Sequence, residues 1–395
     1  MAEWKECLLS DLGTVVGGAT PSTKNPANYE GGTISWITPK DLADFKGRYI
    51  ARGERMITDA GLSSCSTQLM PEHSVLFSSR APIGYVAIAA NELCTNQGFK
   101  SVVPNERTDY LFLYYLLRYY KDAIENLGSG TTFKEVSGST MRNVKVKVPV
   151  LFSEQKKIAS VLGAIDDKIE ENERINNNLQ EQARALYRSW FVDFEPFDGS
   201  KPSNWKNGRL KDVLSLQRSS IKAGENTSLP YLPIDIIPMN TFGLSDVKPN
   251  EEAQSSLITF SKDDIVIGAM RVYFHRVIIA PFDGITRTTC FTLRPFNADY
   301  LGFSLLCCDQ DSSIEYAQQT SKGSTMPYAV WDGGLGDMEI PIPDPKTAHR
   351  FNEIVMPMIR IIQSSFAENK NLRELRDSLL PRLMSGELDV SDLDL

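Results

Sequence analysis

Side chains that can read a nucleic acid gather in short, turn-rich stretches of this chain. Arginine can hold guanine with two hydrogen bonds, asparagine or glutamine can hold adenine, and lysine can neutralise a phosphate. Such residues lie in stretches 77–85 and 270–276, each between two apolar runs, and in stretches 95–100 and 286–289 that follow them. The candidate DNA contacts are Arg80, Tyr85, Asn96, Gln97, Lys100, Arg271, Arg276, Arg287 and Thr288. For any one of them, a solvated loop position is the commoner role.

Two further loops, residues 129–134 and 321–326, combine glycine, hydroxyl groups and a basic side chain. Backbone amides in loops of this kind can bind phosphate, and the same composition also suits a purely structural turn. The additional DNA-binding candidates in these loops are Thr131, Thr132, Lys134, Lys322 and Ser324.

No motif of a catalytic site occurs in the sequence. The phosphate-binding P-loop, the His-Glu-x-x-His zinc motif and the Gly-x-Ser-x-Gly elbow are absent, as is the Asn/Asp-Pro-Pro-aromatic signature of adenine methyltransferases. The six cysteines and three histidines do not have zinc-ligand spacing. We therefore expect reduced, structural thiols, no catalytic or metal-binding residue and no cofactor bound by this chain.

Length and composition favour several structural units without a membrane span. A chain of 395 residues with 42% hydrophobic content is long enough for two to four units. The N-terminus does not resemble a signal peptide, and no apolar run approaches the roughly 20 residues needed to span a bilayer, so we expect a cytoplasmic protein. The net charge of -8 argues against DNA binding, but residues 1–150 carry 16 basic and 15 acidic residues and are nearly neutral.

The chain contains an internal duplication. Trp4-Lys5, Leu9 and Asp11 recur as Trp205-Lys206, Leu210 and Asp212 at a constant offset. Residues 75–89 then match residues 266–280, the loop at 130–132 matches 323–325, and each half closes with an alternating strand pattern before a proline. Several matches in the same order indicate two similar domains.

Each half ends in a long amphipathic helix with a heptad seam. The expected seam residues of the first helix are Ile158, Leu162, Ile165, Ile169, Leu179 and Leu186, and those of the second are Val355, Met358, Ile362, Leu372 and Leu379. We expect the helices, each about 50 Å long, to form an antiparallel pair. The alternative is that each helix packs only on its own domain.

Polar residues interrupt the middle of both seams, at Asn172 and Asn176 in the first helix and at Ser365 and Asn369 in the second. Such residues can fix the register of a helix pair, although they can also be fraying points. Pro357 should kink the second helix or mark its true start nearby.

The expected layout follows from these patterns and from a linker rich in Pro, Gly and Asp. Its segments are a first domain at 1–150, a long helix at 151–192, the linker at 193–203, a second domain at 204–346, a second helix at 347–386 and an acidic tail at 387–395.

With these features in place, the sequence resembles the specificity (S) subunits of type I restriction-modification enzymes over nearly its full length. The resemblance is carried by the Trp4-Lys5 opening and by stretches 34–42, 95–100, 130–134 and 148–169. It implies an α+β fold in which two pseudo-repeated α/β target recognition domains are separated by two long helices forming an antiparallel coiled coil. The second half departs from the pattern, having Ala348-His349 where the first has Glu154-Gln155.

The resemblance also implies a function and partners. Each recognition domain would read one half of a bipartite site on double-stranded DNA, and the helices would act as a ruler between the halves. The partners would be two methylation subunits, which bind S-adenosylmethionine, and restriction subunits, which use ATP and Mg²⁺; this chain would itself be non-catalytic. The alternatives are a coiled-coil scaffold that binds only protein and an enzyme with an unrecognised site.

Overall fold

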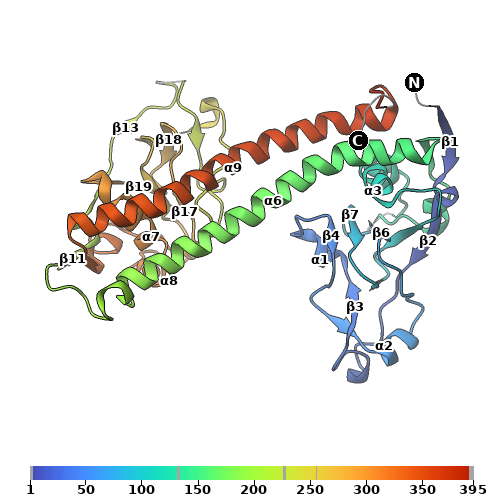
Figure 1. Cartoon of the computed structure of the whole chain (residues 1–395), viewed down its shortest axis with the longest axis horizontal. Helices are drawn as coiled ribbons and strands as arrows, with labels where there is room; N and C mark the ends of the chain where they lie inside the picture. Colours follow the sequence, from blue (N-terminus) through green and yellow to red (C-terminus); the bar gives the residue numbers. More distant parts are fainter. Residues whose placement is uncertain (1–2, 131–133, 226–227, 255, 391–395) are drawn as a thin grey trace. The chain divides into compact units, whose positions relative to one another are not determined.

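The computed structural model of the chain describes residues 3–130, 134–225, 228–254 and 256–390 (Figure 1). Its contacts divide the chain into two compact units. Unit 1 comprises Met1–Glu170 with Leu372–Leu395, and unit 2 comprises Glu171–Asn371. Both long helices therefore pass from one unit into the other.

Unit 1 contains ten strands within its described residues. They are β1 (Trp4–Leu8), β2 (Gly13–Gly17), β3 (Ile34–Ile37), β4 (Tyr49–Ile50), β5 (Met56–Ile57), β6 (Val75–Ser79), β7 (Ile83–Ala89), β8 (Cys94–Thr95), β9 (Lys100–Pro104) and β10 (Lys145–Pro149). One sheet has the order β2-β9-β6-β7-β4, a second has the order β5-β3-β8, and β1 pairs antiparallel with β10.

Short helices cover these sheets. They are η1 (Leu9–Asp11), η2 (Pro26–Asn28), α1 (Pro39–Ala43), α2 (Asp59–Ser63), α3 (Tyr110–Tyr119), α4 (Lys121–Asn126) and α5 (Gly138–Arg142). Helix α3 begins where Asp109 Oδ1 accepts a hydrogen bond from the amide of Phe112 at 2.8 Å, a regular N-cap. Its central residues 112–117 are buried against the five-stranded sheet, in the same core as Val75 and Phe77 of β6.

Unit 2 repeats this plan. Its strands are β11 (Lys206–Arg209), β12 (Leu214–Leu216), β13 (Ser220–Ile221), β14 (Tyr231–Leu232), β15 (Leu257–Phe260), β16 (Ile265–Gly268), β17 (Val277–Ile279), β18 (Gly284–Arg287), β19 (Cys290–Pro295) and β20 (Glu339–Ile342). Its short helices are η3 (Glu195–Phe197), η4 (Leu210–Asp212), η5 (Asn250–Glu252), η6 (Val272–Phe274), η7 (Ala298–Tyr300), α7 (Leu301–Cys308), α8 (Asp311–Gln319) and η8 (Leu335–Asp337).

The strand order confirms the duplication. The order β12-β19-β16-β17 in unit 2 corresponds to β2-β9-β6-β7 in unit 1, and β11 pairs with β20 as β1 pairs with β10. In both units a second sheet contains a parallel strand pair, β3 with β8 in the three-stranded sheet of unit 1 and β14 with β18 in the four-stranded sheet β13-β15-β18-β14 of unit 2. The two halves differ at the sheet edges, because among the described residues the five-stranded sheet of unit 1 has β4 beside β7, whereas β17 is the edge strand of the corresponding four-stranded sheet of unit 2.

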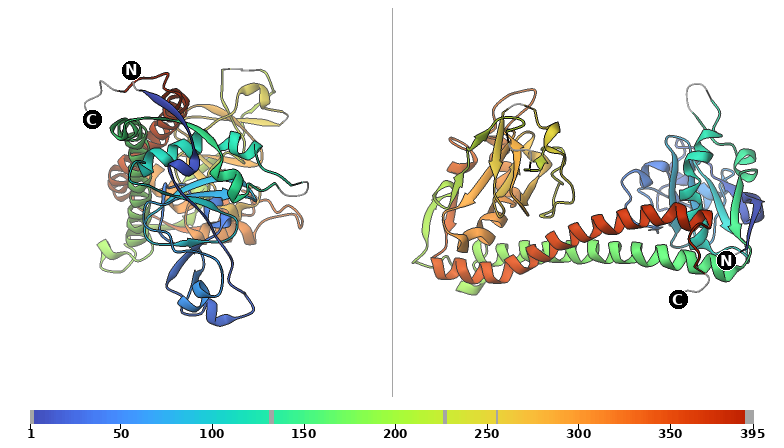
Figure 2. Two further views of the ribbon diagram at one scale, coloured as in Figure 1. Left: turned by 90° about the vertical axis from the view of Figure 1, so that its right-hand side faces the viewer. Right: turned by 90° about the horizontal axis from the view of Figure 1, so that it is seen from above.

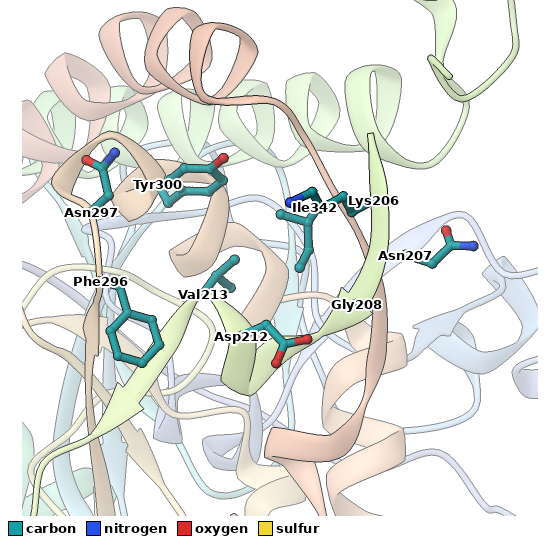
Figure 3. A pocket seen from close by; sticks show the side chains of 9 residues that line it. All are labelled: Lys206, Asn207, Gly208, Asp212, Val213, Phe296, Asn297, Tyr300 and Ile342. Carbon is teal, nitrogen blue, oxygen red and sulfur yellow. The ribbon is translucent and has the colours of Figure 1, made fainter. Parts of the chain in front are cut away.

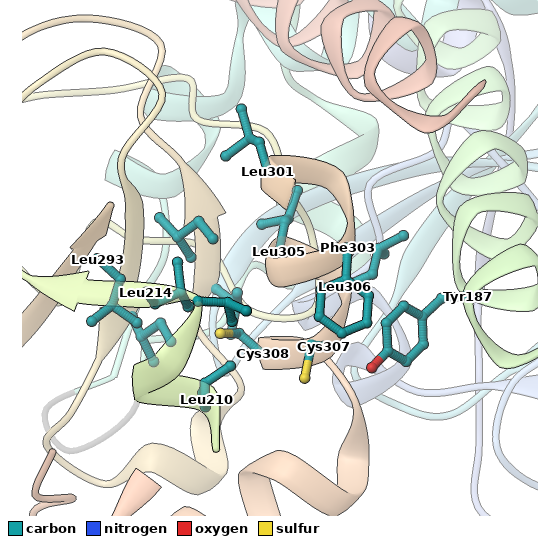
Figure 4. Packing of buried hydrophobic residues seen from close by; sticks show 14 of the residues in the cluster. Tyr187, Leu210, Leu214, Leu293, Leu301, Phe303, Leu305, Leu306, Cys307 and Cys308 are labelled. Atoms are coloured by element: carbon teal, nitrogen blue, oxygen red, sulfur yellow. The ribbon is translucent and has the colours of Figure 1, made fainter. Parts of the chain in front are cut away.

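The core of unit 2 joins the sheet to the first long helix. Phe303 of α7 lies with its ring centroid 5.8 Å from that of Tyr187, and both side chains are buried among Leu210, Leu214 and Leu293 (Figure 4). Aromatic side chains bury large apolar areas, so this cluster anchors the C-terminal end of the helix on the sheet and helix α7 of unit 2.

The two long helices are α6 (Phe152–Phe191) and α9 (Pro345–Ser385) (Figure 2). Within unit 1, Ile158 and Leu162 of α6 share a core with Leu379 and Leu383 of α9. Within unit 2, the ring of Trp190 near the end of α6 lies 5.4 Å from that of Phe351 near the start of α9. Residue numbers rise along one helix as they fall along the other, so the expected antiparallel pairing is confirmed. Residues of both helices also belong to the hydrophobic core of each unit, so each helix packs on unit 1 at one end and on unit 2 at the other.

The structure buries the seam residues fully or partly. Those that are buried are Ile158, Leu162, Ile169, Val355 and Ile362, and those that are partly buried are Ile165, Leu179, Leu186, Met358, Leu372 and Leu379. Asn172 connects the polar middles of the two seams, because its Nδ2 donates to Asn369 Oδ1 at 2.8 Å and to Glu368 Oε2 at 2.7 Å.

Helix α9 does not start at Pro357, contrary to one of the two possibilities that the sequence left open. It begins at Pro345, where Asp344 accepts hydrogen bonds from the amides of Lys346 and Thr347 and from the Thr347 hydroxyl, which lowers the pKa of Asp344. Pro357 lies on the exposed face, while Val355, Met356 and Ile359 are buried. Proline has no amide hydrogen, so one backbone hydrogen bond of the helix is missing at Pro357. Packing of the buried face stabilises the helix despite this loss.

Replacing both Asn172 and Asn369 by leucine should leave the helix pair as stable as before, or more stable. Removing both members of a buried polar pair eliminates their desolvation cost, whereas the single change Asn369→Leu leaves the Asn172 amide without one acceptor and should cost about 1–3 kcal/mol. Urea unfolding of the wild-type chain and of the two variants measures this difference. A double variant that is destabilised as much as the single one would show that the polar pair itself stabilises the helices.

Candidate nucleic-acid interface

Three loops that are far apart in the sequence converge in unit 1. They are residues 80–82 between β6 and β7, residues 96–99 before β9, and a loop closed by the antiparallel bridge between Ser129 and Glu135. The amide of Ser79 donates to the carbonyl of Gly98 at 2.7 Å, and the amide of Val136 donates to the carbonyl of Ser79 at 3.0 Å. The end of β6 therefore carries all three loops.

Two basic side chains, one on the first loop and one at the start of β9, meet at the carboxylate of Glu135. Arg80 Nη1 and Lys100 Nζ each lie 3.5 Å from an oxygen of Glu135. The arginine side chain is 34% exposed and the lysine side chain 15%, so Arg80 is the better placed of the two to reach a phosphate or a base. Lys134 is exposed, as is Gln97, whose Oε1 accepts a hydrogen bond from the Thr20 hydroxyl.

Two other candidates in unit 1, Asn96 and Tyr85, have structural contacts within the unit. Asn96 Oδ1 accepts a hydrogen bond from the amide of Gly98 at 2.8 Å and so closes a turn. Tyr85 is partly buried against the core that contains Leu76 and Phe99. Thr131 and Thr132 lie outside the described residues.

The equivalent three loops converge in unit 2. Here the amide of Ala269 donates to the carbonyl of Thr289 at 2.9 Å, and the amide of Arg271 donates to the carbonyl of Pro327 at 2.8 Å. The third loop is closed by a bridge between Lys322 and Tyr328, the positions that the repeat matches to Ser129 and Glu135. The sequence matches between the loops thus correspond to matching places in the two folds.

Most candidates in unit 2 are exposed. These are Arg271, Arg287, Thr288, Lys322 and Ser324. Arg276 differs, because its Nη1 donates to the backbone carbonyls of Ile234 and Ile237, both at 2.5 Å. This arginine is better placed to hold its loop than to reach DNA.

A charged cluster that sequence reasoning missed ties the loop at 271–276 to α6. Asp309 is 3% exposed as a residue; its carboxylate accepts two hydrogen bonds from Arg184 of α6, at 2.7 and 3.1 Å, and lies 2.9 Å from His275 Nε2. Burial lowers the pKa of Arg184, but its hydrogen bonds to Asp309 more than compensate and leave that pKa raised. No sequence signal predicts this cluster, because its members lie far apart in the chain.

A hollow in unit 2 lies outside these loops. It has a volume of about 400 Å³ and lies between β11 and η7 (Figure 3). Two of its polar groups already have backbone partners, since Asp212 accepts from the amide of Arg209 at 2.7 Å and Tyr300 donates to the carbonyl of Pro343 at 2.8 Å. Among the described residues, no group of three or more His, Cys, Asp or Glu side chains could hold a metal ion.

The cysteines are all free thiols. Burial raises the pKa of Cys94, Cys290 and Cys307 to about 11, so these thiols stay protonated near neutral pH. None of the helices in the described part of the chain has the length and apolar character needed to cross a bilayer.

The chain has two matching α/β units with equivalent loops, and a long antiparallel helix pair. These features place it in a class of two-domain recognition proteins. The chain belongs to the family of type I restriction enzyme specificity subunits. It is 33% identical to the MjaIX specificity subunit of Methanocaldococcus jannaschii over 99% of this chain and 95% of that protein. The resemblance inferred from the sequence motifs is confirmed.

Other comparisons agree. A family model described as the type I restriction modification DNA specificity domain matches residues 1–181. The HindI specificity subunit of Haemophilus influenzae is 23% identical, covering 73% of this chain and 76% of that protein. The crystal structure of the S subunit from M. genitalium has a TM-score of 0.67 at 16% identity and covers 99% of this chain and 97% of that one, which confirms the fold.

Proposed function

We propose that this chain is the DNA-reading, non-catalytic subunit of a type I restriction-modification complex, and that each unit reads one half of a bipartite site. The observation that carries the proposal is the convergence of three equivalent loops in both units. Loops held by a rigid sheet are the usual place for recognition residues, because they can vary without disturbing the core.

In this proposal, the candidates whose side chains are exposed, together with the partly exposed Arg80, make the contacts to bases and phosphates. They are Arg80, Gln97 and Lys134 in unit 1 and Arg271, Arg287, Thr288, Lys322 and Ser324 in unit 2. The net charge of -8 is compatible with this proposal, because these basic side chains are concentrated on the loops.

The partners complete the activity. Two methylation subunits would supply S-adenosylmethionine and transfer its methyl group to adenine, and restriction subunits would use ATP and Mg²⁺ to cleave unmodified DNA. Helices α6 and α9 would set the gap between the two half-sites. The cytoplasm, where the host DNA lies, is the compartment in which this complex would act.

Co-expression with the neighbouring methylation-subunit gene, followed by mapping of methylated adenines in the host DNA, tests the proposal. A single methylated motif made of two short parts around a fixed gap supports it. Unmodified DNA, together with a complex that binds DNA without sequence preference or not at all, contradicts it and favours a scaffold that binds only protein.

Lys134→Ala and Lys322→Ala, one in each unit, should weaken binding of the assembled complex to all DNA sequences alike. Loss of one phosphate contact lowers the slope of log K against log salt concentration by about 0.9. Titration of fluorescent duplexes at several salt concentrations measures the slope. The control is Lys206→Ala, an exposed lysine on β11 outside these loops, which should leave it unchanged. Equal slopes for the wild-type complex and the three variants would show that Lys134 and Lys322 do not contact phosphates.

A further inference from the structure

The loop between β16 and β17 holds a single turn of helix between two left-handed residues. Arg271 has φ 51° and ψ 56°, and His275 has φ 50° and ψ 57°, on either side of η6. Residues with a side chain disfavour this conformation, which persists only where the surrounding structure holds it and which often marks a functional position.

Contacts on both sides of the turn hold it in place. Val272 is buried, the amide of Arg271 donates to the carbonyl of Pro327, and the carbonyl of His275 accepts from the amide of Asn240 at 2.9 Å. The imidazole of His275 lies against Asp309, which Arg184 holds in turn. The turn is therefore pre-organised before any ligand arrives.

The turn presents an aromatic pair to solvent. Tyr273 is 46% exposed and Phe274 is 36% exposed, with their ring centroids 5.0 Å apart and the ring planes at 55°. Met326 and Tyr328, also exposed, lie on the segment that pairs with Met270 and Arg271. Clustered exposed apolar side chains on a rigid loop indicate an interaction surface.

The charges beside the aromatic pair favour a polyanion. Arg271 precedes the turn and is exposed, and exposed Lys322 lies on the neighbouring loop that Tyr328 closes. The nearby carboxylates have basic partners: Asp309 is paired with Arg184, and Asp311 lies 3.6 Å from His275 Nδ1. A nucleic acid satisfies both requirements, because it offers phosphates next to apolar surfaces on the bases.

We propose that Tyr273 and Phe274 recognise a thymine, by packing against its C5-methyl group in the major groove, within the half-site read by unit 2. This inference rests on the proposed function. The methyl group distinguishes thymine from cytosine, and aromatic side chains suit apolar contact with it. The alternative, insertion of one of these rings between two base pairs, would need a ring with both faces free. More than half of the surface of each residue is covered, which favours the contact with the methyl group.

The two units would then read different features of their half-sites. The equivalent hairpin of unit 1 carries Arg80, Ala81 and Pro82 at this position and has no aromatic pair there. The aromatic contact to thymine made by this turn would thus belong to the half-site of unit 2.

The test uses the complex of the full chain with its methylation subunits and duplexes containing the mapped site. Each thymine of both half-sites is replaced in turn by deoxyuridine, which lacks the methyl group. We expect about 3- to 5-fold weaker binding at a position in one half-site, the size of the effect of burying one methyl group. The variant Tyr273→Ala with Phe274→Ala should bind the thymine and uracil duplexes equally well.

Two controls separate this contact from general damage. Phe296 follows the C-terminal end of β19 and its side chain is 69% exposed. The variant Phe296→Ala removes this aromatic side chain and should keep the uracil sensitivity. Tyr273→Phe keeps the ring and should keep the sensitivity as well. Assembly with the methylation subunits and an unchanged Tm establish that each variant is folded.

Two results would overturn the inference: a wild-type complex that tolerates uracil at every position, or a double alanine variant that retains the sensitivity. A double variant that fails to assemble while the wild-type complex tolerates uracil would assign the pair to protein docking instead. Failure of the proposed function is distinguishable, because the wild-type complex would then show no preference for any site.

Discussion

Lengthening both long helices by seven residues should widen the gap in the recognised DNA site by about three base pairs, because seven residues extend a helix by about 10 Å and each base pair of B-DNA occupies about 3.4 Å. The insertions belong between Glu171 and Asn172 in α6 and between Asn369 and Lys370 in α9, on the same side of the Asn172–Asn369 hydrogen bond. A heptad nearly preserves the seam, since it rotates a straight helix by only about 20° from the original direction. The two half-sites themselves should not change.

Methylation mapping in cells that carry the lengthened chain measures the gap. Insertion into α6 alone is the matched control, because it shifts one seam against the other and should abolish assembly or stability. An unchanged gap in the doubly lengthened chain, with methylation still present, would contradict the role of the helices as a ruler.

Removing the carboxylate of Asp166 should destabilise unit 1 by about 3–5 kcal/mol, the usual cost of breaking a buried ion pair, because Arg376 loses its buried partner and keeps the exposed Asp377. Asp166 is 4% exposed, accepts a hydrogen bond from Arg376 of α9 at 2.7 Å and one from the hydroxyl of Tyr115 at 2.6 Å, and lies 3.8 Å from Arg118. Burial next to this carboxylate raises the pKa of Tyr115 far above its ordinary value, so the tyrosine remains a donor at any physiological pH. The network joins α6, α9 and α3.

Asp377→Ala is the matched control for Asp166→Ala. Asp377 lies 2.8 Å from the same arginine, but its side chain is 59% exposed, so its loss should cost less than about 1 kcal/mol. Because the chain has two units, hydrogen exchange of α3 and of residues 372–385 is the appropriate measurement, since it reports local stability. Equal effects of the two substitutions would show that burial does not strengthen this network.

The helices and the duplication were predictable because they depend on short-range periodicity. A heptad pattern specifies which helix face is buried, and the offset between matching residues specifies equivalent strands. The sequence did not reveal how α9 passes through Pro357, because the packing of Val355, Met356 and Ile359 on the opposite face outweighs the local preference of proline.

The candidate interface was predictable only in outline. Residue type placed Arg80, Arg271 and Lys322 on loops. Within unit 2 the structure brings the loops of Arg271 and Lys322 together, and within unit 1 it brings the loop of Arg80 to the loop closed by Ser129 and Glu135. Residue type could not separate Arg276, whose guanidinium is bonded to backbone carbonyls, from Arg271, whose side chain is exposed. Nor could it show that Asp309 supports His275, because such contacts depend on tertiary structure.

The central claim is that each unit reads its own half of the DNA site, and an exchange of one domain tests it most directly. Residues 204–343 would be replaced by the corresponding residues of the MjaIX specificity subunit, and the methylated motif would be mapped beside those of both parent proteins. We expect one half of the motif to be retained and the other to be replaced by a half from the relative. A motif in which both halves change, or in which neither does, would contradict independent reading by the two units.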